Sequence, residues 1–338
     1  MIFNSEFWMA QSEAMMHSHH AEDGSLVSPH LMNELLASIS PRSCDPQAGI
    51  FGPASMSWRI DRESALFLGA GRAALLQLAH PWVAAALAEH SNLLLDPIAR
   101  FHNTFRVVFT MVFGTRTQAL QTARRLHTLH TGIRGELPGG VGRYAQGSHY
   151  EANDVGALRW VFATLVESAL LAYECVLPPL SEAEREEYYA ESKTMAALFG
   201  IPADALPHGW AAFTAYCEEM VQSDALGVSD RSRILAHSVL HGAGSRIRPP
   251  LWYRALTASW MPARLRNDFD LDLDALSQRA LERALRWVPL AYRTLPPFLR
   301  FVGPYQEAEH RLGGRPPGAF VSWNNRFWTG QSRLPVDE

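Results

Sequence analysis

The chain divides into apolar segments of helix length, most of them opened by a capping residue and closed by glycine or proline. Asp96-Pro97 places a capping carboxylate before a proline at the first helical position, and Ser181 with Glu184 has the spacing of a capping box. No segment alternates as a half-buried strand does, and there is no internal repeat, so the sequence predicts an all-α fold. Asp61 is expected to cap a helix over 61–78, and Asn153-Asp154 to cap a long helix over 155–177. We expect further helices over 97–114 and 115–134, from 182 onward, and near 204–222, 230–240, 249–262 and 273–295.

Length and composition predict one large domain. The chain has 338 residues, of which 47% are hydrophobic and 19% charged, so it can bury a sizeable core. Residues 1–50 show no clear period and are expected to form an irregular N-terminal extension. The helical domain is expected to cover 51–312, and a C-terminal tail to follow over 313–338.

The charge and the cysteine content of the chain indicate which binding partners and which cellular compartment to expect. The formal net charge is −4 and the arginines are scattered, so we expect no binding to nucleic acid. Three widely spaced cysteines fit a reducing compartment, and the N-terminus has no signal-peptide pattern. The most apolar stretch, 158–180, is interrupted by Arg159, Glu167 and Glu174, which indicates a buried helix rather than a transmembrane segment. A cytoplasmic protein is therefore expected.

Two histidines and an arginine stand out in the segment 124–134. On a helix that continues to residue 134, spacings of three and four place His127, His130 and Arg134 along one face. Imidazole is a common ligand of transition metals and of haem iron, and a guanidinium one turn away suits a carboxylate such as a haem propionate. A pair of solvated surface histidines is the alternative interpretation, and the spacing alone leaves both open.

Other polar or small residues lie inside apolar helices. Arg100, Asn103 and Thr104 share one side of an expected helix rich in Phe, Val and Met, where they could face a histidine across a haem pocket. The alternative is structural: an arginine paired with a carboxylate, or a threonine bonded to its own helix. Gly69 and Gly71 likewise indicate either close helix packing or a backbone that approaches a flat ligand.

A series of short motifs runs along the chain. The motifs are Gln77-Leu78-Ala79-His80-Pro81, Glu89-His90-Ser91, Asp96-Pro97-x-x-Arg100, Phe113-Gly114, His130-x-x-x-Arg134, Asn153-Asp154, Trp160-x-x-Ala163-Thr164-Leu165, Tyr188-Tyr189 and Leu295-Pro296-Pro297-Phe298-Leu299-Arg300. Their order and spacing resemble the MpaB/rubber-oxygenase catalytic-domain family, which includes latex-clearing protein, over residues 52–312. The resemblance implies an all-helical, globin-related single domain that encloses a b-type haem.

The resemblance also implies which residues hold the haem. The proximal iron ligand of the family falls on His130, and the arginine that follows it falls on Arg134. The threonine of the next long helix falls on Thr164, and His127 is a neighbour of the ligand with an open role at the cofactor.

On the distal, oxygen-binding side, the Arg-x-x-Lys-Thr motif of the rubber-cleaving branch falls on Arg100, Asn103 and Thr104. Asparagine thus stands where that branch has lysine. It can still donate a hydrogen bond to dioxygen, but rubber is not the expected substrate. Glu89 matches the acidic residue proposed as a base in that branch.

These implications give an expected function: a haem b-dependent oxygenase that uses dioxygen on a small or medium apolar substrate, isoprenoid or otherwise unsaturated. Two alternatives remain open. One is a helical protein that binds or senses haem without turnover, and the other is a haem-free protein that holds a metal through His127 and His130. The sequence does not indicate the oligomeric state.

Overall fold

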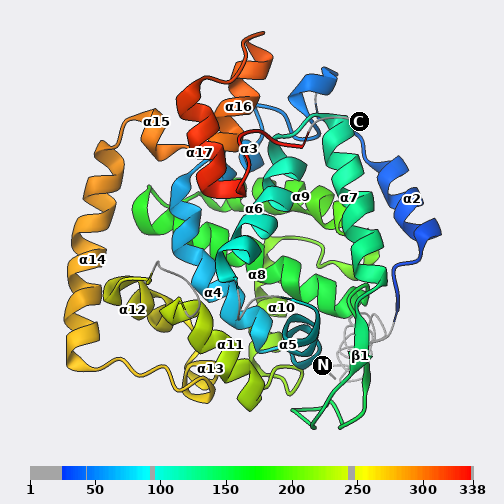
Figure 1. Cartoon of the computed structure of the whole chain (residues 1–338), viewed down its shortest axis with the longest axis vertical. Coiled ribbons are helices and arrows are strands. Elements are labelled where there is room, and N and C mark those ends of the chain that lie inside the picture. The colour runs from blue at the N-terminus through cyan, green and yellow to red at the C-terminus, as the bar shows by residue number, and fades with distance from the viewer. Residues whose placement is uncertain (1–24, 43, 92–95, 243–247, 336–338) are drawn as a thin grey trace, which may run out of the picture.

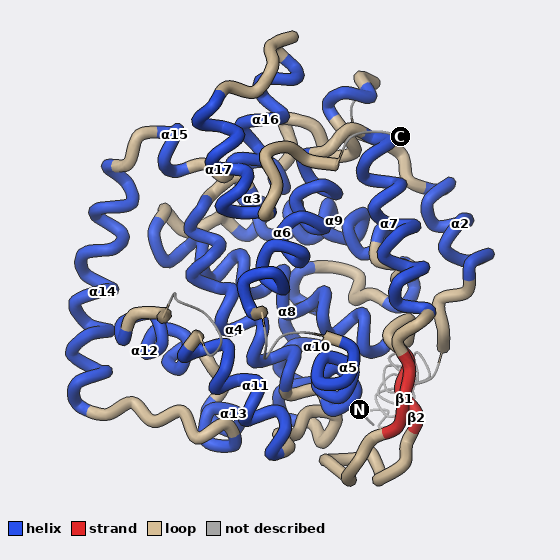
Figure 2. Tube along the Cα trace, viewed as in Figure 1, coloured by secondary structure: helices blue, strands red, loops and turns tan. Residues whose placement is uncertain are grey.

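Helices make up most of the chain, as Figure 2 shows. The computed structural model describes residues 25–42, 44–91, 96–242 and 248–335. Its helices are α2 (Pro29–Ser38), α3 (Met56–Asp61), α4 (Phe67–Leu78), α5 (Pro81–His90), α6 (Pro97–Phe113), α7 (Arg116–Thr131), α8 (Val155–Val176), α9 (Glu182–Leu198), α10 (Trp210–Gln222), α11 (Asp230–His241), α12 (Leu251–Trp260), α13 (Ala263–Asp268), α14 (Ala275–Thr294), α15 (Pro297–Arg300), α16 (Gly303–Leu312) and α17 (Ala319–Thr329). Short 3-10 turns cover Pro46–Ala48, Ser64–Leu66 and Ala203–Ala205. The prediction of a mainly α-helical fold is confirmed.

Several helices begin where the capping residues predict. The Asp96 carboxylate accepts a hydrogen bond from the Ala99 amide at 2.9 Å and opens α6. Asp154 opens α8 in the same way, accepting from the Ala157 amide at 2.8 Å. Ser181 forms the expected capping box at the start of α9. These side chains satisfy amides that have no partner within their own helix, which is why each helix starts there.

Three expectations about local structure are wrong. Asp61 is the last residue of α3 rather than a cap, and the helix expected over 61–78 is α4, which begins only at Phe67. The helix expected over 115–134 ends at Thr131, and two short antiparallel strands follow: β1 (Arg134–Glu136) and β2 (His149–Glu151). The N-terminal extension is not irregular throughout, since its described part contains α2, with Met32 and Leu36 buried.

Helix α8 lies at the centre of the core and packs closely against α4 (Figure 1). The Trp160 indole donates to the Leu76 carbonyl at 2.9 Å, and Arg72 donates to the Ser168 hydroxyl at 2.9 Å. A Cβ atom on Gly69 would lie 2.4 Å from the Ser168 carbonyl oxygen, so only glycine permits this approach. Gly71 meets Thr257 of α12 in the same way. Close helix packing therefore explains both glycines.

Helix α8 is also the one helix of the described part that is long and apolar enough to cross a membrane, judged by length and composition. Of its most apolar window, 61% is buried inside the protein. Helices α4, α9 and α14 pack against it. The expectation that the chain has no transmembrane segment stays a prediction.

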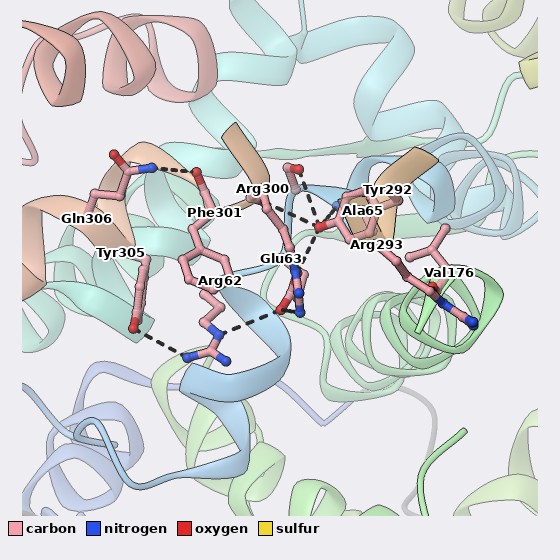
Figure 3. A network of polar contacts seen from close by, with 11 residues as sticks. Arg62, Glu63, Ala65, Val176, Tyr292, Arg293, Arg300, Phe301, Tyr305 and Gln306 are labelled. Atoms are coloured by element: carbon pink, nitrogen blue, oxygen red, sulfur yellow. Dashed lines mark hydrogen bonds and ion pairs between the residues drawn. The ribbon is translucent and has the colours of Figure 1, made fainter. Parts of the chain in front are cut away.

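A buried ion pair ties the C-terminal helices to the start of the domain (Figure 3). Glu63, just after α3, is only 1% exposed and accepts two hydrogen bonds from Arg300 of α15, at 2.6 and 2.7 Å. The Tyr292 hydroxyl of α14 donates to the same carboxylate at 2.8 Å, and the Arg62 Nε atom lies 3.7 Å from it. A two-pronged arginine–carboxylate contact of this kind fixes orientation as well as position. It therefore anchors α14 and α15 on the core.

Candidate functional site

His130 lies in the last turn of α7, where this helix meets the β1–β2 hairpin. Helix α7 begins with a capping box formed by Thr115 and Gln118, and its inner face buries Ala119 and Ala123. After the helix ends, the Ile133 amide donates to the His130 carbonyl at 2.9 Å. The His130 side chain itself is half-buried.

His127, one turn earlier, holds α7 to its neighbours. Its Nε2 atom lies 2.8 Å from the Val27 carbonyl oxygen. A carbonyl only accepts, so this bond requires the hydrogen on Nε2. The backbone carbonyl of His127 accepts from the Thr131 hydroxyl at 2.9 Å and from the Asn153 amide at 3.2 Å. Because Asn153 immediately precedes the cap of α8, these contacts fix the last turn of α7 against the start of α8.

The His130 imidazole is neutral at neutral pH. Burial is the largest cause that lowers the pKa of His130 to about 4, and the positive charge of Arg100 and the proximity of His127 contribute to the same shift. Arg100 lies in the first turn of α6, and α6 is joined to α7 by the short link 114–115 and packs against it. Among the residues that the structure describes, none forms a hydrogen bond with the His130 ring. No described residue therefore occupies the lone pair of this ring.

Arg100 occupies an unusual environment for an arginine. Its side chain is exposed to solvent, yet burial lowers the pKa of its guanidinium. Both observations hold for a side chain that water reaches from one direction while protein surrounds it on the others. No described carboxylate forms an ion pair with Arg100. The structure therefore brings a partly desolvated cation, which pairs with none of the described carboxylates, close to a neutral imidazole.

The two residues that follow Arg100 in the expected distal motif are partly engaged. The Asn103 side-chain oxygen accepts a hydrogen bond from Arg106, which leaves the amide NH2 of Asn103 as a donor. Thr104 donates its hydroxyl hydrogen to the Arg100 carbonyl at 3.0 Å, so its oxygen can only accept from another group. Asn103 is exposed and Thr104 half-buried.

Arg134 is not on the helix that carries the histidines. Gly132 ends α7, and Arg134 pairs in β1 with Glu151 of β2. The expectation that His127, His130 and Arg134 stack along one helix face is therefore wrong. The hairpin redirects the chain because the residues after Gly132 form strand hydrogen bonds instead of continuing the helix. Arg134 is exposed and has no ion pair with a described residue.

Glu89 lies at the end of α5, beside the same hairpin. Its Oε2 atom accepts a short hydrogen bond of 2.5 Å from the Tyr150 hydroxyl of β2, and its Oε1 atom lies 3.5 Å from Arg231 of α11. Burial, together with Glu89, raises the pKa of Tyr150. The described partners of Glu89 are thus Tyr150 and Arg231, and no described contact joins it to His130 or Arg100.

Thr164 is buried between α8 and α4. Its hydroxyl donates to the Val161 carbonyl at 2.7 Å and accepts from the Gln77 amide at 3.0 Å. Since both of these contacts are internal to the core, they give Thr164 a role in joining the two central helices.

The residues around His130 fit a haem better than a bare metal ion. Within the described ranges, no three His, Cys, Asp or Glu residues gather as a metal-binding group. A b-type haem needs only one axial imidazole from the protein, and its propionates need cations. His130 supplies a neutral ring without a described hydrogen-bond partner, and the exposed Arg134 of β1 supplies a cation without a described carboxylate.

Sequence reasoning missed the residues that position the site. Asn153 and Gln77 lie inside the motifs quoted above, but their roles depend on contacts with other helices. Tyr150 and Arg231 gave no signal at all, because they come from a hairpin and a helix far from Glu89 in the chain.

Comparison with known proteins identifies the family. The family model described as "ER-bound oxygenase mpaB/B'/Rubber oxygenase, catalytic domain" matches residues 58–290, well over half of the chain. No curated protein and no solved structure matches. The matched segment includes His130, Arg100 and every other site residue named above, and it begins just before the end of α3. The chain belongs to the family of ER-bound mpaB-type and rubber oxygenases, and its matched part is an oxygenase-type catalytic domain.

Proposed function

We propose that the chain is a haem b-dependent oxygenase that uses dioxygen on a small or medium apolar substrate, with His130 as the proximal iron ligand. The observation that carries this proposal is the neutral His130 ring, whose pKa of about 4 keeps its lone pair free at physiological pH. Haem, when bound, supplies the iron that binds and activates dioxygen. Membership of an oxygenase family supports the reaction class.

The cations near His130 would hold the carboxylates of the cofactor. Arg134 is exposed on the strand that follows the ligand and has no ion pair with a described residue. We assign Arg134 to a propionate. His127 would act through α7: its bond to Val27 and the contacts of its carbonyl hold the last helical turn, and with it His130, in place. Thr164 would act through its bond to Gln77.

The distal side would be formed by Arg100, Asn103 and Thr104. Arg100 supplies a positive charge in a partly desolvated setting, which favours a partner that carries or develops negative charge. The free amide NH2 of Asn103 can donate a hydrogen bond, whereas Thr104 has already used its hydroxyl hydrogen. We therefore assign hydrogen-bond donation to Asn103.

Glu89 would accept a proton from the substrate. Tyr150 already donates to Oε2, and Arg231 faces Oε1. These two contacts fix the side chain in one orientation.

Haem reconstitution tests the ligand assignment. The purified chain, supplied with haem, is expected to show a Soret band that His130→Ala weakens or shifts. His149→Ala is the matched control, because its ring is 81% exposed on β2 and should leave the band unchanged. A band that is the same in His130→Ala, or no band in the wild type, contradicts the proposal.

Oxygen uptake then separates the oxygenase from its alternatives. Consumption of dioxygen with an unsaturated isoprenoid supports turnover, whereas a haem protein that consumes none is a binding or sensing protein. A protein that carries a metal and no haem would instead support the two-histidine metal site. We also propose a cytoplasmic location, which the free cysteines Cys44, Cys175 and Cys217 support, and cell fractionation tests it.

A further inference from the structure

The C-terminal helices expose an uncommon number of large apolar side chains. Figure 1 shows α14 along one edge of the molecule, with α15 and α17 following around its upper end. On these helices and the link 295–296, the exposed large apolar residues are Leu276, Leu285, Trp287, Leu290, Leu295, Phe298, Leu299, Phe320, Trp323 and Phe327. We call this set the outer apolar face. Single exposed apolar residues are normal, but a face this extended indicates an interaction surface.

On α14 three of the exposed apolar residues share one side of the helix with an arginine. Leu276, Arg283, Trp287 and Leu290 follow at spacings of seven, four and three, so they lie on one helical stripe. Trp287 is 58% exposed and Leu276 is 65% exposed. The opposite side of α14 includes the buried Tyr292, and the helix packs on α12 and α8. The outward stripe is therefore not part of the core.

The aromatic residues of α15 and α17 form a second, connected part of the face. Phe320, Trp323 and Phe327 are three and four residues apart, so they share one side of α17. The Phe298 ring of α15 meets the Phe320 ring edge-on, with 5.4 Å between their centroids. Underneath, Arg300 anchors α15 to the buried Glu63 (Figure 3). These rings thus stand on a fixed backbone.

The charge of these helices restricts the occupant. Helices α14, α15 and α17 carry six arginines and one glutamate, in a chain whose formal net charge is −4. The arginines are Arg279, Arg283, Arg286, Arg293, Arg300 and Arg326, and the glutamate is Glu282. Arg293 donates to the Val176 carbonyl and Arg300 pairs with Glu63, so the other four arginines are the ones that a partner can meet. A second copy of the chain, paired through the same face, would bring like charges together. A partner for this face has to be both apolar and anionic.

We propose that the outer apolar face docks on the surface of a bilayer that contains anionic phospholipids. Such a surface offers phosphates to the arginines and acyl chains to the leucines and phenylalanines. Trp287 and Trp323 suit the headgroup level, where an amphipathic ring finds both environments. The helices lie in the interface and do not cross it. This docking requires no haem and is compatible with a cytoplasmic protein.

Vesicle flotation tests the proposal with the full chain. The wild type is expected to float with phosphatidylcholine vesicles that contain one third phosphatidylglycerol, and to do so less as the salt concentration rises. The double variant Trp287→Glu/Trp323→Glu should lower the vesicle-bound to free ratio. Arg279→Glu/Arg283→Glu should lower it by at least about thirtyfold, because each arginine near an anionic surface favours binding about fivefold.

Ile234→Glu is the matched control, because Ile234 is 59% exposed on α11, outside the outer apolar face. It should float like the wild type, and circular dichroism should show that all variants are folded. Equal flotation of the wild type and both double variants overturns the proposal, as does a wild type that never floats. Sedimentation velocity provides a further check: a dimer that Trp287→Glu dissociates would assign the face to a second copy and overturn the lipid assignment.

Discussion

Acid should release haem from His130, its proposed ligand, only at an unusually low pH. Iron and protons compete for the same ring nitrogen, so the apparent affinity falls as the imidazole becomes protonated. At pH 5, a histidine with the ordinary pKa of 6.5 would bind the haem iron about thirtyfold more weakly than its neutral form does. With a pKa of about 4, His130 would lose only about a tenth of its affinity for the iron at that pH. The Soret band should therefore be nearly constant from pH 8 to pH 5 and decline near pH 4.

The charge of Arg100 is one cause of this behaviour, so removing it should shift the acid limit. Arg100→Gln is expected to raise the pKa of His130 and to move the loss of the band to higher pH. Arg106→Gln is the matched control, because Arg106 lies on the same helix and contacts Asn103 and Thr329.

The same titration can be followed without haem. In the free protein, NMR of the labelled imidazoles should place the midpoint of His130 near 4 and show its rise in Arg100→Gln. A midpoint near 6.5 in the wild type, or an identical midpoint in Arg100→Gln and Arg106→Gln, refutes the reasoning.

Three further predictions concern stability. Burial raises the pKa of Asp61 from 3.8 to about 7. The contribution of Asp61 to stability is therefore full below pH 3.8 and is lost as the pH rises through 7. Asp61→Asn should make the melting temperature, measured by scanning calorimetry, less sensitive to pH between these values. Arg300→Ala leaves the buried Glu63 carboxylate with only the more distant Arg62 as a cation and should lower the free energy of unfolding by about 3 kcal/mol in urea titrations. Asn153→Ala removes a donor to the His127 carbonyl and should lower the free energy of unfolding by about 1 kcal/mol in the same assay. It should also weaken haem binding. Unchanged values in any of the three would contradict the corresponding contact.

Local signals in the sequence predicted much of the helical framework. A capping side chain acts within its own turn, so Asp96, Asp154 and Ser181 marked helix starts that the structure confirms. The end of α7 was harder, because Gly132 is compatible with a helix interior at a small cost. What ends the helix is the pairing of 134–136 with 149–151, which depends on a partner strand far along the chain.

The functional roles of the candidate site residues stay predictions from the family motif, whereas the closeness of two of them follows from the order of the helices. His130 and Arg100 lie near each other because consecutive helices pack together, so their spacing along the chain carried the information. The Tyr150 partner of Glu89 comes from the hairpin, and the Glu63–Arg300 pair joins the two ends of the domain. No local pattern encodes such contacts, because they exist only once the chain has folded.

Imidazole rescue tests the central claim most directly. His130→Gly removes the proposed ligand and leaves space for a free imidazole. We expect the wild type, supplied with haem, to show oxidised and reduced spectra of a histidine-ligated b-type haem. The glycine variant should lose that signature and regain it when imidazole is added. A glycine variant whose spectra match the wild type without imidazole would contradict the assignment of His130 as the iron ligand.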